Sequence, residues 1–144
     1  MKQIDLAVKE RKQGPKNVAY KLRLKGAIPA VVYGGEDPSM PLEVEIKPLQ
    51  KIVAAHKGQN VLFNLNIEAA AGKVSTLAML KDIQRHPATG YTEHVDFVRV
   101  SLKKKIEVRV LLKLTGEAIG IKEGGVVEAH MRDILVKSYP HEIP

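Results

Sequence analysis

Three side chains near the N-terminus have the types and the spacing that suit contact with a nucleic acid. Lys16, Tyr20 and Arg23 lie at positions i, i+4 and i+7 of a segment rich in helix-forming residues. A helix would place them in one stripe along its surface. The two cations would pair with phosphates, and the ring between them would stack on a base or a sugar. The alternative is an ordinary amphipathic helix whose basic face is simply solvated.

The helix that must carry this stripe is predicted over residues 16–25, with Gly26 as its C-terminal stop. Lys21 and Lys25 project away from the stripe and are expected to add only long-range attraction. The apolar side chains of the segment fall on another side and are expected to face the core. They are Val18, Ala19 and Leu22.

A second concentration of polar chemistry is centred on a predicted strand over residues 94–100. In a strand, His94 and Asp96 share one face, whereas Val95 and Phe97 point to the core. An aspartate that faces RNA can accept a hydrogen bond from a base amino group, but it repels phosphates. Asp96 is therefore expected to read a base, or to orient His94 or a nearby arginine.

The segment before this strand adds an amide, a guanidinium and an imidazole, from Gln84, Arg85 and His86. Two other interpretations stay open. Buried polar groups often pair, so a purely structural hydrogen bond between His94 and Asp96 would account for both residues. A metal ion held by His86, His94 and Asp96 is a weaker hypothesis, because their spacing matches no closed zinc pattern.

A strand predicted over residues 30–35 ends in Tyr33, Gly34 and Gly35. Glycine allows a positive φ or a close backbone approach, so the turn would present Tyr33 to RNA. Equally, Tyr33 would cap the core and the two glycines would serve only the turn.

Basic charge is concentrated near the N-terminus. The 144 residues carry a formal net charge of +7. Residues 1–25 contain eight basic and two acidic side chains, whereas the other 119 residues contain fifteen basic and fourteen acidic ones. This clustering is typical of a surface that binds a polyanion. A solvated basic surface that serves solubility is the alternative.

Other function classes find little support in the sequence. The absence of cysteine excludes disulfides, thiolate zinc sites and cysteine nucleophiles. The N-terminus lacks the apolar region of a secretory signal, and no window approaches about 18 consecutive apolar residues. Gly72 and Lys73 lack the spacing of a phosphate-binding loop, and no serine lies in a nucleophile elbow. We expect a cytoplasmic protein that is not an enzyme and has no cofactor and no bound metal.

Alternating hydrophobicity predicts a mainly β protein with short helices (α+β). A second helix is predicted from Pro48 to Gly58, and a domain boundary is expected near residues 99–104. Residues 1–100 would form one domain, whereas residues 101–144 are too few to bury a core and are expected to be the first part of a truncated C-terminal β-domain. Strands are predicted over 4–8, 30–35, 42–46, 61–67, 74–80, 94–100 and 106–114, with one or two more in 126–138.

Four motifs in this order resemble one known family: KNVAYKLRLKG, IPAVVYGG, KDIQRHPATGYTEHVDF, and LTGEAIGIKEGGVVEAHMRDILV with YPHEIP. It is the bacterial large-subunit ribosomal protein family that binds 5S rRNA, in its longer form called the general stress protein CTC. The resemblance covers essentially the whole chain. It implies an N-terminal six-stranded antiparallel β-barrel with flanking helices, similar in fold to the anticodon-binding domain of glutaminyl-tRNA synthetase. A partial all-β C-terminal domain would follow.

The resemblance also implies the partner, which is the loop E region of 5S rRNA in the central protuberance of the large ribosomal subunit, beside neighbouring ribosomal components. Tyr20 and Lys21 stand where relatives often have two adjacent arginines, and lysine cannot supply the bidentate fork of arginine. A contact of these two residues with RNA is therefore expected to be weaker than that of two arginines, or to have a different geometry. The residues that the resemblance assigns to RNA are Arg11, Lys16, Lys21, Arg23, Tyr33, Gly34, Gln84, Arg85, His94 and Asp96.

Two hypotheses from different function classes follow. The first is a non-catalytic, ribosome-associated RNA-binding protein with no membrane contact and no small-molecule substrate. The second is a stress-response adaptor that binds a protein partner through its C-terminal β-domain, where an incomplete sheet would leave an exposed edge.

Overall fold

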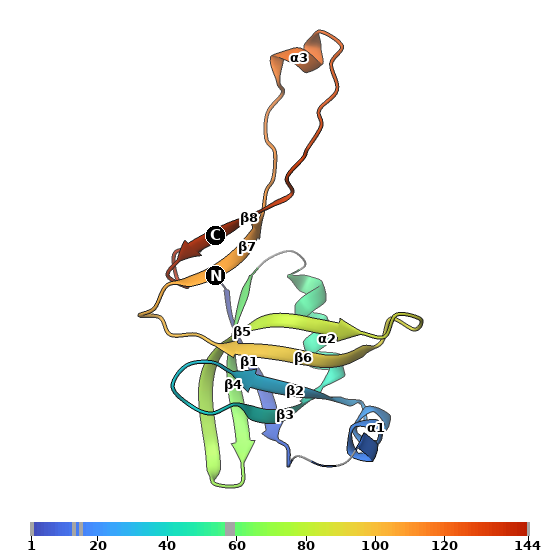
Figure 1. The fold of residues 1–144 in the computed structure, drawn as a ribbon, viewed down its shortest axis with the longest axis vertical. Helices are drawn as coiled ribbons and strands as arrows, with labels where there is room; N and C mark the ends of the chain where they lie inside the picture. The colour runs from blue at the N-terminus through green and yellow to red at the C-terminus, as the bar shows by residue number, and fades with distance from the viewer. Residues whose placement is uncertain (1, 13, 15, 57–59, 144) are drawn as a thin grey trace.

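The computed structural model describes residues 2–12, 14, 16–56 and 60–143. It contains a closed barrel of six strands and a two-stranded sheet that follows the barrel in the chain (Figure 1). The predicted mainly β fold with a six-stranded N-terminal barrel is therefore confirmed. The barrel strands are β1 (Lys2–Glu10), β2 (Ala27–Tyr33), β3 (Met40–Glu45), β4 (Val61–Ala69), β5 (Gly72–Arg85) and β6 (Thr92–Arg99). The second sheet contains β7 (Ile106–Leu111) and β8 (Asp133–Ser138), and the helices are α1 (Lys16–Leu24), α2 (Ile46–Ala55) and α3 (Ile119–Lys122).

The strands of the barrel follow the order β1-β3-β2-β6-β5-β4, and β4 closes onto β1. Four neighbouring pairs are antiparallel, but β1 pairs with β4 and β2 pairs with β6 in parallel. The barrel is thus mixed, rather than antiparallel throughout as expected. Parallel neighbours require long crossover connections. Four other elements separate the two strands of each parallel pair, which provides the necessary length.

The barrel interior is filled by alternating apolar side chains of all six strands. Its centre is mostly aliphatic, and Leu65 is fully buried there. Phe63 and Phe97 meet edge to face, with ring centroids 5.6 Å apart and an interplanar angle of 72°. Side chains alternate between the two faces of a strand, so the neighbours of each core residue point outward. The buried positions of β6 therefore decide which of its polar residues face solvent.

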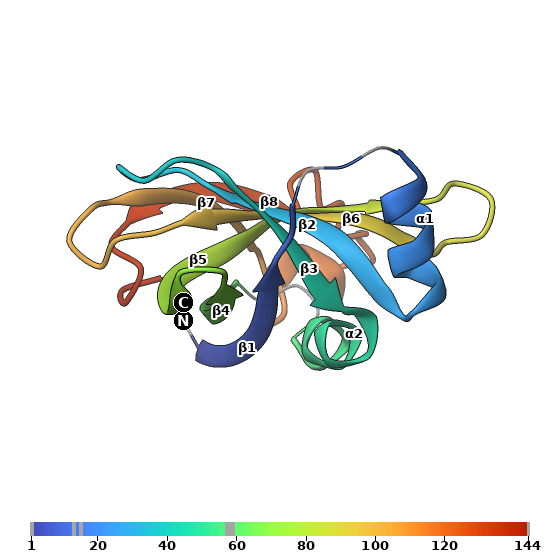
Figure 2. The same ribbon diagram turned by 90° about the horizontal axis from the view of Figure 1, so that it is seen from below.

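Helix α1 lies against β2 on the outside of the barrel, as seen from below in Figure 2. Leu22 is buried, and Val18 and Ala19 are half-buried, so the predicted core-facing side of this helix is confirmed. The helix ends at Leu24, close to the predicted stop. Gly26 follows with φ +79°, a conformation that favours glycine.

Helix α2 begins at Ile46, two residues earlier than expected. Pro48 lies in its first turn, where the missing backbone N–H has no intrahelical partner to lose. Leu49 is buried, and Ile52 and Val53 pack against the barrel core. The predicted stop at Gly58 lies outside the described residues.

The two-stranded sheet of β7 and β8 packs on the outside of β5 and β6. Met79 of β5 and Val108 of β7 share a buried cluster with Ile143, and Val98 of β6 packs against it. Pro140 is also fully buried. At the surface of this segment, the Ser138 hydroxyl donates a hydrogen bond of 2.8 Å to Glu142, which lowers the pKa of that carboxyl.

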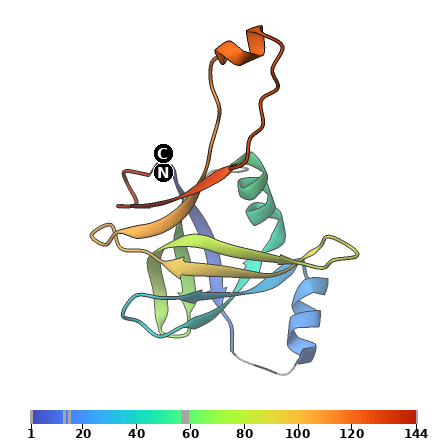
Figure 3. The same ribbon diagram turned by 45° about the horizontal axis from the view of Figure 1, so that its top comes forward.

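Residues 112–132 form an exposed arm that projects from the second sheet and carries the single turn of α3 (Figure 3). The strand expected over 106–114 is shorter than predicted, because β7 ends at Leu111 and both Leu112 and Leu114 are exposed. One strand, β8, forms within 126–138. The sequence did not predict α3. None of the described helices is long and apolar enough to cross a membrane.

Candidate nucleic-acid interface

The register of the barrel gathers several candidate residues on its outer face. Val95 and Phe97 are fully buried, so His94 and Asp96 of β6 point outward. On one side of β6, Gln84 of β5 pairs with His94. On the other side, Val31 of β2 pairs with Asp96. The outward face of β6 is therefore continuous with those of β5 and β2.

Arg11 joins this face from the end of β1. Its backbone N–H donates a hydrogen bond of 2.9 Å to the carbonyl of Pro41, and Pro41 pairs with Val31. Arg11 thus lies in the same row across the barrel as Asp96, with β3 and β2 between them. The Nε atom of Arg11 is buried and forms no hydrogen bond within the described part of the chain.

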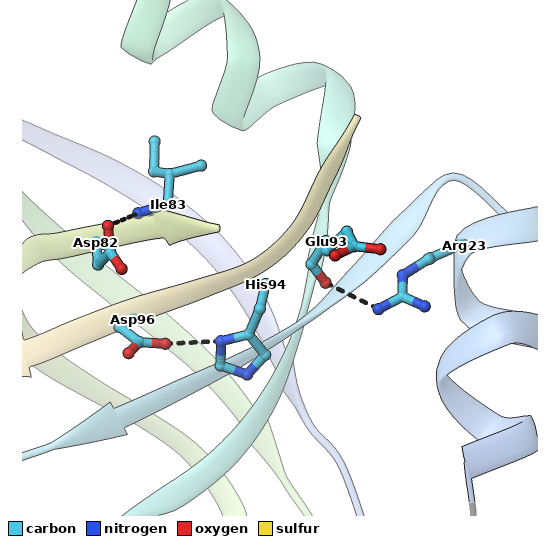
Figure 4. Close-up of polar contacts among 6 residues, drawn as sticks. All are labelled: Arg23, Asp82, Ile83, Glu93, His94 and Asp96. Carbon is cyan, nitrogen blue, oxygen red and sulfur yellow. Dashed lines mark hydrogen bonds and ion pairs between the residues drawn. The ribbon is translucent and has the colours of Figure 1, made fainter. Parts of the chain in front are cut away.

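His94 and Asp96 face each other along β6 (Figure 4). Nδ1 of His94 lies 2.6 Å from Oδ1 of Asp96, and their side chains are 29% and 24% exposed. Among the described residues, neither atom forms a well-directed hydrogen bond, although both are buried. The contact is therefore a close pairing of the two side chains. Each group remains partly open to a ligand.

Arg23 connects α1 to the start of β6. Its guanidinium donates a hydrogen bond of 3.2 Å from Nη2 to the backbone carbonyl of Glu93, next to His94 (Figure 4). Arg23 is exposed, and a guanidinium has five N–H donors, so this bond leaves donors for a phosphate. The structure thus brings the basic helix and the His94–Asp96 pair together, although they are about seventy residues apart in the chain.

Other exposed side chains of α1 lie near Arg23. Tyr20 is 64% exposed, and Lys21 is exposed beside it. Lys16 lies in the first turn of the helix, but its side chain is outside the part that the structure describes. Figure 2 shows that α1 is close to the hairpin between β5 and β6, on which Arg85 and His86 lie.

The Tyr33 turn lies on the same outer face, toward the other end of β6. Tyr33 pairs with Val98, and Val32 beside it is fully buried, so the ring of Tyr33 points away from the core. Gly34 has φ +85° and Gly35 has φ +75°, which confirms the predicted backbone conformation. Tyr33 is half-buried on the outside of the barrel rather than a cap on its interior.

His86 has a structural contact that the sequence did not suggest. Its Nδ1 accepts hydrogen bonds of 3.3 Å from the backbone N–H groups of Ala88 and Thr89. The backbone N–H of His86 donates a hydrogen bond of 2.8 Å to the backbone carbonyl of Tyr91. His86 therefore closes the turn between β5 and β6. Among the described residues, no group of three or more His, Cys, Asp or Glu side chains could hold a metal ion.

Asp82 is a neighbour of the candidate site that the sequence did not reveal. It pairs with Asp96 across the two strands, so two acidic residues lie opposite each other on the outer face. The register of β5 shifts between Leu80 and Asp82, and this bulge decides which side chains share the face of Asp96. Adjacent like charges on neighbouring strands repel each other. A ligand that supplies hydrogen-bond donors would relieve that repulsion, whereas a phosphate would increase it.

A groove of about 690 Å³ lies elsewhere on the barrel, between the two larger helices. It is lined by residues of α1, α2 and strands β1 to β4 and holds none of the candidate RNA contacts. Its charges are mixed: Lys9, Lys25 and Lys47 beside Asp5, Glu43, Glu45 and Glu68.

The fold and this face define a small mixed β-barrel protein whose outer surface gathers groups that can hydrogen-bond to RNA. Two family models match the chain: the ribosomal L25p family over residues 6–97, and the C-terminal domain of ribosomal protein TL5 over residues 105–144. The chain belongs to the ribosomal L25p family. The resemblance found in the sequence is confirmed.

Curated relatives are similar along most of the chain. The large ribosomal subunit protein bL25 of Desulforudis audaxviator is 38% identical over 142 residues, which cover 98% of this chain and 67% of that protein. The bL25 protein of Moorella thermoacetica is 33% identical over 139 residues, covering 96% and 66%. That of Halalkalibacterium halodurans is 39% identical over 128 residues, covering 89% and 58%. This chain therefore spans about two thirds or less of the length of these relatives.

Proposed function

We propose that this protein is a non-catalytic component of the large ribosomal subunit that binds 5S rRNA, at the loop E region in the central protuberance. The observation that carries the proposal is the pairing of His94 with Asp96 beside Arg23 on one outer face of the barrel. Membership of the ribosomal L25p family supports it, because relatives are named large ribosomal subunit proteins.

Different residues of this face would contact the phosphates and the bases of the RNA. Arg11 and the basic residues of α1 would contact phosphates, which supply much of the affinity for RNA. Asp96 would accept a hydrogen bond from a base, and His94, Gln84 and Tyr33 would add hydrogen bonds and stacking. Sequence-specific recognition of RNA uses such contacts with bases that are accessible in loops or in distorted helices.

The carboxylates decide which part of the RNA meets the centre of this face. Asp82 and Asp96 lie opposite each other, so a phosphate placed above them would be repelled. Base amino groups are donors and would instead be attracted. The RNA would therefore lie with base edges over Asp96 and with its backbone toward α1 and Arg11.

We assign these contacts to an RNA-binding unit of residues 1–100. Residues 101–144 would be the first part of a second β-domain. The protein would act in the cytoplasm as part of the ribosome, with neighbouring ribosomal components as further partners and without a cofactor, a small-molecule substrate or a membrane.

Equilibrium binding tests this proposal. The protein is titrated against 5S rRNA and against a size-matched structured control RNA, at low and at near-physiological salt. We expect a preference for 5S rRNA that persists as salt rises, because base contacts do not depend on counterion release. Equal binding to both RNAs that vanishes with salt would contradict the proposal and leave only a nonspecific basic patch.

The contribution of Arg23 to phosphate binding can be measured separately. Replacing Arg23 with alanine is expected to reduce the slope of log affinity against log salt concentration by about one unit, if one phosphate contact is lost. Arg23→Lys keeps the charge and should retain most of the slope. Lys51→Ala on α2 is the control, since Lys51 is exposed but lies on an element that holds none of the candidate contacts. An unchanged salt slope for Arg23→Ala would show that Arg23 contacts no phosphate and only stabilises the start of β6.

A second function is favoured by one observation, the apolar side chains exposed on the second sheet. Ile134 and Leu135 of β8 are 44% and 61% exposed, and Leu111 of β7 is 57% exposed. A two-stranded sheet also has unpaired strand edges, which can pair with another chain. These features suit a stress-response adaptor that binds a protein partner here. Leu135→Lys should then abolish co-purification of that partner and leave binding to 5S rRNA intact.

A further inference from the structure

Arg99, the last residue of β6, holds the segment that follows β2. Its Nη1 donates hydrogen bonds to two backbone carbonyls, at 3.2 Å to Gly34 and at 3.0 Å to Asp37. The two carbonyls belong to residues more than sixty positions earlier in the chain. One side chain thus bridges both ends of a four-residue turn.

The turn also packs closely on the end of β6. A Cβ atom on Gly34 would lie 3.1 Å from Cγ2 of Val98, which is tighter than ordinary contact. A Cβ atom on Gly35 would lie 3.8 Å from Cβ and Cδ of Arg99. The backbone at Gly34 and Gly35 therefore lies directly against Val98 and Arg99. Both glycines also have positive φ, a conformation that other residues rarely adopt.

Within the described residues, little else holds this turn in place. Residues 35–39 are exposed and belong to no strand or helix. Among the described residues, this segment forms one ion pair, which joins Lys104 to Glu36 at 3.9 Å between side chains that are 72% and 94% exposed. Such a pair contributes little in water. The position of the turn therefore depends mainly on Arg99.

We propose that Arg99 is a positioning residue. It holds the turn of residues 34–37, next to Tyr33, in the conformation that binds RNA. The proposal rests on the RNA-binding function proposed above. Arg99 is half-buried, and its Nε is buried without a hydrogen bond to any described residue. Both hydrogen bonds of its guanidinium go to the turn, so Arg99 would act on RNA through the turn rather than through a phosphate contact of its own.

Two variants disturb the turn in different ways. Arg99→Met keeps much of the length of the side chain but removes the charge and all donors. Gly34→Ala leaves every charge in place and adds a Cβ atom against Val98 at a strained φ. Arg109→Met is the matched control, because Arg109 is an exposed arginine on β7, outside the barrel.

Affinity for 5S rRNA and its salt dependence are measured for each variant. We expect Arg99→Met and Gly34→Ala each to weaken binding to 5S rRNA by about tenfold, roughly the loss of one hydrogen bond between the displaced turn and RNA, with an unchanged salt slope. The double variant should bind 5S rRNA about as tightly as the weaker of the two single variants, because both changes act on the same turn. Arg109→Met should bind like the unmodified protein, and Arg99→Lys should recover part of the loss.

Two results would overturn the proposal. A salt slope reduced by about one unit in Arg99→Met, with the preference for 5S rRNA unchanged, would make Arg99 a phosphate contact. Unchanged affinity of Arg99→Met for 5S rRNA would show that RNA binding does not depend on the hydrogen bonds from Arg99 to the turn.

Amide hydrogen exchange of residues 34–37 in the free protein separates this proposal from the RNA-binding function. Faster exchange in Arg99→Met, with an unchanged melting temperature, is expected if Arg99 holds the turn. Unchanged exchange would overturn that role. If the unmodified protein shows no preference for 5S rRNA, the proposed function fails and the link to RNA fails with it. The exchange rates still decide whether Arg99 fixes the turn.

Discussion

Replacing Asp96 with alanine is expected to weaken binding to 5S rRNA by about 1–3 kcal/mol, the range for one good base contact. The carboxylate pairs with His94 at 2.6 Å, so its loss removes a base acceptor and also frees the imidazole to turn. The salt slope should change little, because no phosphate contact is lost. Binding to an unrelated structured RNA should stay the same or strengthen slightly, since one negative charge leaves the surface.

The matched control for this prediction is Asp82→Ala. Asp82 carries the same charge directly opposite Asp96, but its Oδ1 accepts a hydrogen bond of 2.8 Å from the backbone N–H of Ile83. We expect this variant to bind both RNAs as well as the unmodified protein or slightly better. If Asp96→Ala bound 5S rRNA like the unmodified protein, the base-reading role of Asp96 would be wrong, and its contact with His94 would be structural only.

Replacing Phe97 with alanine is expected to lower the free energy of unfolding by about 3–5 kcal/mol, the usual cost of truncating a buried aromatic residue. Phe97 is fully buried and meets the ring of Phe63 edge to face in the centre of the barrel. It also lies next to Asp96 on β6, so a cavity there would loosen the strand that carries the candidate site. Urea denaturation followed by circular dichroism measures the effect.

Tyr91→Ala provides the control for stability. Tyr91 is 73% exposed in the hairpin between β5 and β6, and its side chain forms no hydrogen bond in the described part of the chain. Its removal should change the free energy of unfolding by less than about 0.5 kcal/mol. A loss of less than about 1 kcal/mol for Phe97→Ala would contradict the central place of this residue in the core.

Much of the local structure could be predicted from the order of residue types. Alternation along β6 correctly placed Val95 and Phe97 inside and His94 and Asp96 outside, because successive side chains of a strand always point to opposite faces. Helical spacing likewise predicted that Leu22 is buried and Tyr20 exposed on α1. These predictions depend only on the geometry of one strand or one helix, which neighbouring residues determine.

The partners of each strand could not be predicted in this way. Alternation has the same period in parallel and antiparallel sheets, so it did not reveal that β2 lies parallel to β6. It also missed the bulge after Leu80, which shifts the register by one residue and brings Asp82 opposite Asp96. Only the closed barrel determines these pairings, because they join residues that are distant in the chain.

The sequence by itself thus determined most of the strands and the two larger helices, the faces on which their residues lie, and the family to which the chain belongs. The tertiary structure alone decided that Arg23 reaches the start of β6 and that Arg99 holds the Gly34 turn. Arg23 was predicted only as a phosphate contact, and Arg99 was not singled out in the sequence. Their roles differ because the barrel places particular backbone carbonyls within reach of each guanidinium, and those carbonyls lie more than sixty residues away.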